Sequence, residues 1–203
     1  MDKLSYAWGL AMGSQLKAMG VKELNSESFK DGVKVAFDGG TPEISTEEAQ
    51  KLINDYLQDL EAKATAAAKE AGNKFLEENA KKEGVKVTST GLQYRVIKEG
   101  TGAQPTATDE VTVHYTGKLL DGTVFDSSVN RGEPATFPLN RVIPGWTEGV
   151  QLMKEGAKYE FYIPSDLAYG PNGVPNAIPP HATLIFEVEL ISIGKKESKL
   201  VGI

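Results

Sequence analysis

The sequence predicts an α+β protein, in which an all-helical N-terminal part precedes an antiparallel sheet wrapped around one short helix. Nine of the ten prolines lie between Pro105 and Pro180, and ten of the sixteen aromatic residues follow residue 90. The hydrophobic residues also change their period, from helical spacing in the first part to alternation in the second. These three observations divide the chain into two parts with different secondary structure.

Two helices are predicted at the N-terminus, and we assign residues 1–60 to a helical dimerisation module. The first helix carries hydrophobic residues at helical spacing, namely Leu4, Trp8, Met12, Leu16 and Met19. The second covers 29–37 and ends at Gly39-Gly40. A module of about 60 residues is near the lower limit for an independent core, which favours pairing with a second copy. The alternative is that these helices pack on the C-terminal part of the same chain.

A long stalk helix is predicted over 46–84, with its first part packed in the dimerisation module. Ser45 and Glu48 have the spacing of a capping box at its start. Hydrophobic residues continue to Leu60, whereas alanine and charged residues dominate afterwards, so we expect the second half to be solvated. The helix from Thr46 to about Glu83 would be roughly 55 Å long, with a bend expected at Gly72.

The second domain is predicted over 88–194 and the polar tail over 195–203. Hydrophobic and polar residues alternate in four segments, which are 92–96, 111–115, 157–163 and 184–190. Asp121-Gly122 is typical of a hairpin turn, and the segment from Trp146 to about Met153 has the pattern of a short helix.

Composition excludes several classes of protein and of partner. The net charge is −6, from 22 basic and 28 acidic residues, and no basic cluster occurs, so we expect neither nucleic acid nor a membrane as a partner. The absence of cysteine excludes disulfides and thiolate chemistry. The N-terminus lacks the pattern of a signal peptide. We therefore expect a cytoplasmic protein as the sequence is written, or a periplasmic one if it is a mature or trimmed chain.

The usual residues of covalent, metal or cofactor chemistry are missing, so we expect no cofactor and no metal. His114 falls on the polar side of a predicted strand, and His181 follows two prolines in a loop. Neither has a partner at the spacing of a metal site. The carboxylates Asp121, Asp126 and Asp166 lie in predicted turns, where aspartate is common.

Aromatic and branched residues gather instead at the ends of strands and beside the proline-rich connection 167–180. Each of them alone is better explained by core packing, but together they could line an apolar pocket. Such a pocket suits rotation about an Xaa–Pro bond, whose barrier of about 18–20 kcal/mol arises from amide resonance. Removing water from the bond and supplying about 5.5 kcal/mol would accelerate rotation roughly 10⁴-fold, with no proton transfer.

Five motifs resemble those of the FKBP-type peptidyl-prolyl cis-trans isomerases, also called rotamases. They are VHYTG at 113–117, LDGTVFDSS at 120–128, VIPGW at 142–146, LAYG at 167–170 and IPPHATLIFE at 178–187. The helical module, the stalk and FLEENAKKEG at 75–84 resemble the dimeric bacterial subgroup related to macrophage infectivity potentiator. The resemblance implies an FKBP-like fold for 88–194.

The resemblance also implies the residues of the site. The catalytic residues would be Tyr115, Phe125, Asp126, Val142, Ile143, Trp146, Tyr169 and Phe186. The further substrate-binding residues would be Arg131, Phe137 and Ile178. Trp146 would form the floor of a proline pocket, while the Ile143 N–H and the Tyr169 hydroxyl would bind substrate carbonyls. Ala135 and Val174 depart from the common eukaryotic pattern at the rim, which affects binding of macrolide inhibitors and the residue preference more than activity.

We therefore predict a homodimeric prolyl isomerase that accelerates folding of proline-containing unfolded or partly folded polypeptides, with chaperone activity. The stalks would hold two catalytic domains apart in a V. The main alternative is a chaperone or scaffold that binds clients in the same pocket without catalysis. A purely structural helical dimeriser leaves the aromatic loop unexplained.

Overall fold

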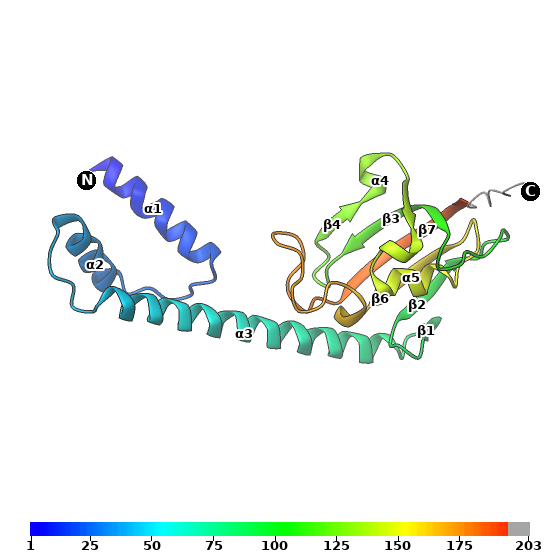
Figure 1. Ribbon diagram of the computed structural model, residues 1–203, viewed down its shortest axis with the longest axis horizontal. Helices are drawn as coiled ribbons and strands as arrows, with labels where there is room; N and C mark the ends of the chain where they lie inside the picture. Colours follow the sequence, from blue (N-terminus) through cyan, green and yellow to red (C-terminus); the bar gives the residue numbers. More distant parts are fainter. Residues whose placement is uncertain (195–203) are drawn as a thin grey trace, which may run out of the picture. The chain divides into compact units, whose positions relative to one another are not determined.

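The computed structural model describes residues 1–194 and has the predicted α+β architecture (Figure 1). The predicted tail, 195–203, lies outside the described residues. The chain divides into two compact units, Met1–Lys63 and Ala64–Ile203, with the boundary inside helix α3, Thr46–Asn79. No helix within 1–194 combines the length and hydrophobicity needed to span a bilayer.

The first unit contains α1, Lys3–Ala18, α2, Ser26–Asp38, and the start of α3. Side chains cap all three helices at their N-termini. Asp2 accepts from the Leu4 and Ser5 N–H groups, Asn25 accepts from Ser28 N–H, and the Ser45 hydroxyl accepts from Glu48 N–H at 3.1 Å. The predicted helix at 29–37 is thus extended to Ser26, and it ends at Gly39 in the left-handed region (φ 68°).

These helices do not bury a core of their own in the single chain. No residue of 1–63 is buried, and large apolar side chains are open to solvent, with exposed fractions of 66% for Trp8 and 88% for Phe37. The hydrophobic residues predicted for the start of the stalk are also open, since Leu52, Ile53 and Tyr56 are all exposed or half-exposed. The apolar faces of this unit therefore lack a covering partner within it.

The second half of α3 was expected to be solvated, which is correct for most of its residues but wrong for one face of the helix. Gly72 and Asn79 are buried, and the Phe75 ring lies 5.8 Å from the Tyr162 ring of the sheet. A Cβ at Gly72 would lie 2.5 Å from Thr183 Oγ1, so this glycine permits close packing. A bend was expected at Gly72, and helix α3 continues through this residue. The small Gly72 on this face lets the second half of α3 pack closely within the second unit.

The predicted end of α3 near Glu83 also needs correction, because the helix ends at Asn79. The N–H groups of Lys81 and Lys82 bond to carbonyls only three residues back, at 3.3 and 3.0 Å, which tightens the chain into a turn. Gly84 follows in the left-handed region (φ 79°), and strand β1 begins at Val85. The turn lets the chain reverse into the sheet.

A seven-stranded antiparallel sheet dominates the second unit. Its strands are β1 (Val85–Val87), β2 (Gln93–Lys98), β3 (Glu110–Lys118), β4 (Val124–Ser127), β5 (Ala135–Pro138), β6 (Lys158–Ile163) and β7 (Leu184–Gly194). The spatial order is β1-β2-β6-β7-β3-β4, and β5 also pairs with β3. The four predicted strands correspond to β2, β3, β6 and β7, whereas β1, β4 and β5 have three or four residues each and carry little periodicity.

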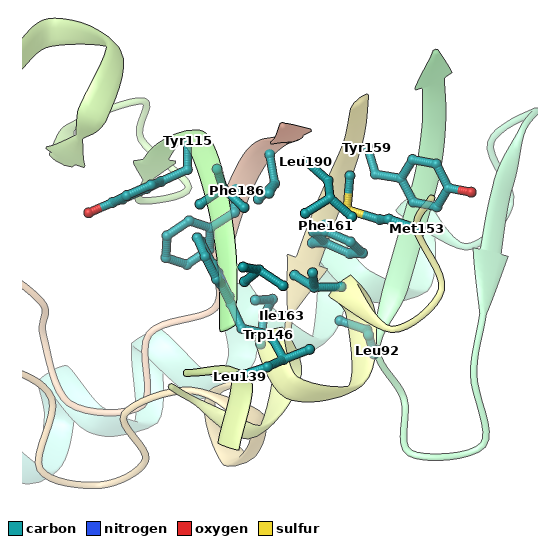
Figure 2. Packing of buried hydrophobic residues seen from close by; sticks show 14 of the residues in the cluster. Leu92, Tyr115, Leu139, Trp146, Met153, Tyr159, Phe161, Ile163, Phe186 and Leu190 are labelled. Carbon is teal, nitrogen blue, oxygen red and sulfur yellow. The ribbon is translucent and has the colours of Figure 1, made fainter. Parts of the chain in front are cut away.

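The core lies between one face of this sheet and helix α5, Pro144–Val150 (Figures 1 and 2). Inward residues alternate along β3 and β7, as the sequence predicts. Phe161, Leu92 and Val111 are fully buried. A Cβ at Gly149 of α5 would lie 2.6 Å from the Phe161 ring, so this position requires glycine for the helix to approach the sheet. The core thereby fixes α5 and the indole of its Trp146.

Candidate active site

A cavity of about 420 Å³ opens where α5 meets the ends of the sheet strands. It is lined by Tyr115, Phe125, Asp126, Phe137, Arg141, Val142, Ile143, Trp146, Tyr169 and Phe186. The structure therefore brings together every residue that the sequence assigns to the site except Arg131 and Ile178. A pocket of this size accommodates a small ring and its neighbouring peptide groups.

Trp146 forms the centre of this pocket, with only 4% of its surface exposed. Three rings meet the indole nearly edge-on, with centroid distances of 5.2 Å to Tyr115, 5.3 Å to Phe186 and 5.9 Å to Phe137. Edge-to-face contacts of this kind hold rings in fixed orientations. The indole is not sealed in the core, because it lines the cavity. The result is a rigid apolar floor with aromatic walls.

Gly117 of β3 leaves room for two rings of the pocket wall, those of Phe125 and Phe186, to pack against each other. Phe125 and Phe186 pack edge-on at 5.5 Å, and a Cβ at Gly117 would lie 2.6 Å from the first ring and 2.7 Å from the second. No real Cβ tolerates such distances, so any side chain here must displace the rings. The glycine in the VHYTG motif therefore has a direct role in the shape of the pocket.

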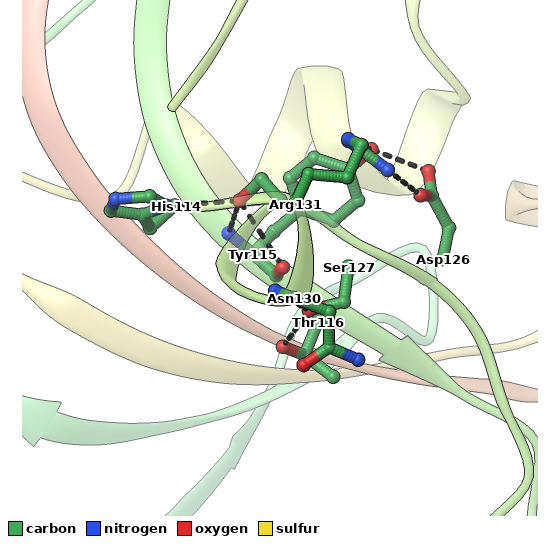
Figure 3. Close-up of polar contacts among 8 residues, drawn as sticks. His114, Tyr115, Thr116, Asp126, Ser127, Asn130 and Arg131 are labelled. Atoms are coloured by element: carbon green, nitrogen blue, oxygen red, sulfur yellow. Dashed lines mark hydrogen bonds and ion pairs between the residues drawn. The ribbon is translucent and has the colours of Figure 1, made fainter. Parts of the chain in front are cut away.

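Three polar groups form a network at the rim (Figure 3). The Tyr115 hydroxyl donates to one oxygen of Asp126, Arg131 donates to the other oxygen, and Arg131 also donates to the Tyr115 hydroxyl at 3.0 Å. Figure 2 shows the same hydroxyl pointing away from the core. Arg131 lies outside the lining residues but reaches the pocket through this network, which ties the Tyr115 ring in place.

The network fixes the protonation states of its members. Burial raises the pKa of Asp126, but the hydrogen bonds from Tyr115 and Arg131 and the charge of Arg131 outweigh it, so the net pKa is lowered. Burial and the hydrogen bond with Asp126 raise the pKa of Tyr115, and the bonds to Tyr115 and Asp126 raise that of Arg131. At neutral pH the carboxylate and guanidinium are therefore charged and the phenol is neutral.

Ser128 supports Tyr115 from behind. On one edge of β3, pairing passes from β4 at Thr116 to β5 at Val113, so the Tyr115 backbone has no neighbouring strand there. Ser128, at the start of helix α4 (Ser128–Arg131), fills this gap: its fully buried hydroxyl accepts from Tyr115 N–H at 2.8 Å. The same oxygen lies 3.1 Å from His114 Nδ1 (Figure 3). His114 thus belongs to the support of the strand and does not line the pocket.

Two hydrogen-bond donors in the pocket are free for a ligand. Within residues 1–194 the Ile143 N–H donates to no other group, although the Ile143 carbonyl accepts from Trp146 and Thr147. The Tyr169 hydroxyl likewise has no partner in that range, and the residue is 39% exposed. Burial, followed by the charge of Asp126, raises the Tyr169 pKa, so the phenol stays protonated and can donate. Both donors are suited to peptide carbonyls.

Ile178 lies elsewhere, in a neighbouring cavity of about 340 Å³ that also includes Leu119. Its side chain is 5% exposed and belongs to the hydrophobic core. An isolated bridge joins Val174 to Ile178 and closes the tip of the proline-rich loop, where Gly173 approaches the Ile178 carbonyl. Ile178 therefore anchors the loop beside the pocket.

Sequence reasoning missed Arg141 as a lining residue. It ends the 3₁₀ turn Leu139–Arg141, and it immediately precedes the VIPGW motif. Its position next to Val142 and Ile143 is the available signal, since a residue adjacent to two wall residues also borders the pocket. A lone arginine in a turn gives no other indication in the sequence.

The pocket can hold a ligand and exclude water, and its single carboxylate, that of Asp126, is already bonded to Tyr115 and Arg131. None of its lining side chains is a serine, threonine, cysteine, histidine or lysine. An aromatic pocket with free donors for two carbonyls is suited to a proline ring and its flanking peptide groups. The fold and site therefore define an enzyme that rotates the peptide bond before proline.

Comparison with known proteins identifies the same class. Residues 101–191 match the family of FKBP-type peptidyl-prolyl cis-trans isomerases, and residues 1–96 match the domain amino terminal to FKBP-type peptidyl-prolyl isomerase. The FKBP-type 22 kDa isomerase of Escherichia coli is 50% identical over 93% of this chain and 93% of its own length. The isomerase Mip of Coxiella burnetii is 43% identical over 96% of this chain and 87% of its own length. The crystal structure of FkpA from E. coli matches with a TM-score of 0.78 and 38% identity, covering 94% of this chain and 95% of that one.

The chain belongs to the FKBP-type peptidyl-prolyl cis-trans isomerases and has relatives named FkpA and Mip. It is an isomerase that acts on proline-containing polypeptides, as the sequence predicts.

Proposed function

We propose that the protein assists folding of unfolded and partly folded polypeptides, acting as a homodimer and combining isomerase with chaperone activity. The observation that supports isomerisation most directly is the cavity over Trp146, with the Ile143 N–H and the Tyr169 hydroxyl free beside it. The Ile143 N–H and the Tyr169 hydroxyl bind the carbonyls on either side of the proline, and the ring rests on the indole.

Catalysis follows from the loss of water around the bound peptide bond. The planar amide is stabilised by charge separation, which water solvates, and this resonance sets the barrier of about 18–20 kcal/mol. In the pocket, aromatic walls replace that water, while donors at fixed positions hold the carbonyls as the bond twists. The twisted amide has less charge separation and loses less in an apolar pocket, so the barrier falls without proton transfer.

The dimer is supported by the state of the N-terminal unit. Its hydrophobic residues are arranged on helices, yet no residue of 1–63 is buried in the single chain. Soluble proteins rarely expose apolar faces of this extent, and a second copy offers matching faces with closed symmetry. Two catalytic domains in one assembly raise the effective concentration of the second site for a client already held by the first.

Refolding of a matched pair of clients tests the folding role. The wild type should shorten the slow phase of a client limited by a cis-proline, and it should not affect a variant of that client without the proline. Phe186→Leu should reduce the acceleration at least about tenfold, because the wall against Trp146 and Phe125 is lost. Light scattering during client aggregation measures chaperone activity separately. An unchanged slow phase with the wild type would contradict the folding role.

The dimer is tested with Trp8→Glu in the full chain. Trp8 is two-thirds exposed in the single chain, so the substitution removes an apolar contact and introduces a charge at the proposed interface. We expect multi-angle light scattering to give twice the chain mass for the wild type and a shift towards the chain mass for the variant. Ile97→Glu, at an exposed residue of β2, is the matched control and should remain dimeric. A wild type with the mass of a single chain would disprove the dimer.

A further inference from the structure

Arg141 is a cation in the pocket wall with no partner of its own. It is exposed, it lines the cavity, and within residues 1–194 it forms no ion pair, hydrogen bond or ring contact. Its backbone position is fixed, because the 3₁₀ turn Leu139–Arg141 begins at the fully buried Leu139 and α5 begins at Pro144, three residues after Arg141. The guanidinium is therefore held near the pocket and remains available to a ligand.

The charges around the pocket are unbalanced as a result. Among the lining residues, Asp126 and Arg141 are the charged ones, and Arg131 neutralises Asp126 through their ion pair. The charge of Arg141 remains uncompensated, in a chain with a net charge of −6. A bound peptide thus experiences a local positive charge on the side of the pocket next to the Ile143 N–H, two residues further along the chain.

We propose that Arg141 is a specificity-determining residue that favours proline sites flanked by glutamate or aspartate. This inference rests on the isomerase function of the same pocket. The planar guanidinium presents paired donors that match a carboxylate, and it repels a lysine or arginine beside the proline. Because the group is exposed, the attraction is modest and depends on ionic strength, with a screening length of about 8 Å at physiological salt.

Peptides that differ in one residue test the proposal. We would compare Glu, Gln and Lys at the position before proline, and then at the position after it, in a protease-free assay at low and high salt. The quantity of interest is the ratio of kcat/KM for the Glu peptide to that for the Lys peptide. In the wild type this ratio should be about two to five at one of the two positions, and it should fall towards one at high salt.

Arg141→Gln should bring this ratio close to one, and Arg141→Glu should reverse it. Lys154→Gln is the matched control: it removes one positive charge from an exposed residue outside the pocket and should leave the ratio unchanged. The ratio cancels any effect common to all peptides, such as a change in folding. Equal ratios in the wild type and both Arg141 variants would overturn the proposal while leaving the isomerase function intact. A wild type inactive on every peptide would instead contradict the isomerase function itself.

Discussion

Gly117→Ala is expected to lower kcat/KM about 10- to 100-fold, although the substitution adds one methyl group and touches no substrate. The added Cβ would lie 2.6 Å from the Phe125 ring and 2.7 Å from the Phe186 ring. Phe186 cannot rotate out of the way freely, because it also packs edge-on against Trp146, and Phe125 packs edge-on against Phe186. The rings must therefore move apart, which widens the pocket and lets water reach the peptide bond. Overpacking of this kind also costs about 1–3 kcal/mol of stability.

The matched control is Gly194→Ala, at the end of β7. A Cβ at Gly194 has ordinary contacts of 3.5 Å with Glu110, and the backbone conformation accepts any residue. We expect wild-type activity and stability from this variant. Circular dichroism and urea unfolding establish that both variants are folded before kcat/KM is measured on a neutral Xaa–Pro peptide. If Gly117→Ala is folded and as active as Gly194→Ala, the shape of the wall formed by Phe125 and Phe186 does not govern catalysis.

The site was predictable from the sequence to a large extent, because its parts lie on elements with a clear pattern. Tyr115 and Phe186 occupy inward positions of β3 and β7, whose alternation determines which face they join. Trp146 begins the predicted short helix, and the motifs placed the remaining wall residues. The periodicity did not predict the gap in strand pairing beside Tyr115 of β3, which Ser128 fills. The strands β4 and β5 that border this gap are too short for their register to be predicted.

The stalk shows where the pattern fails. Gly72, Phe75 and Asn79 recur at helical spacing, but only Phe75 among them is a large apolar residue, so the hydrophobic signal of this face is weak. Yet this face is the one that docks on the sheet, because small residues permit close approach. The hydrophobic first part of the same helix is exposed in the single chain. The hydrophobic pattern identified an apolar face on the first half of the helix, but it did not reveal what each half of the helix packs against.

The second large expected effect concerns the free energy of unfolding, and it arises at the end of α3, where Asn79 packs against the sheet. Asn79 is fully buried, and its Nδ2 donates to Gln93 Oε1 at 3.0 Å. Gln93 in turn donates to the Leu76 carbonyl at 2.8 Å, which fixes the orientation of its amide. Asn79→Asp keeps the shape of the side chain but places a carboxylate oxygen opposite the Gln93 oxygen. Rotating the Gln93 amide to compensate would break its bond to Leu76.

We expect Asn79→Asp to lower the free energy of unfolding by about 3 kcal/mol or more at neutral pH, because a charge is buried without a cation. Burial raises the pKa of the new carboxyl in the folded state, so protonation restores stability at low pH. The loss should therefore grow as the pH rises above about 4, where the unfolded chain ionises first. Urea unfolding followed by Trp146 fluorescence, in a Trp8→Phe background, measures it. Asn54→Asp, at an exposed site of the same helix, should change little. Equal stabilities for the two variants would mean that the end of α3 is not part of the catalytic unit, whereas a large difference makes this segment a support of the pocket domain.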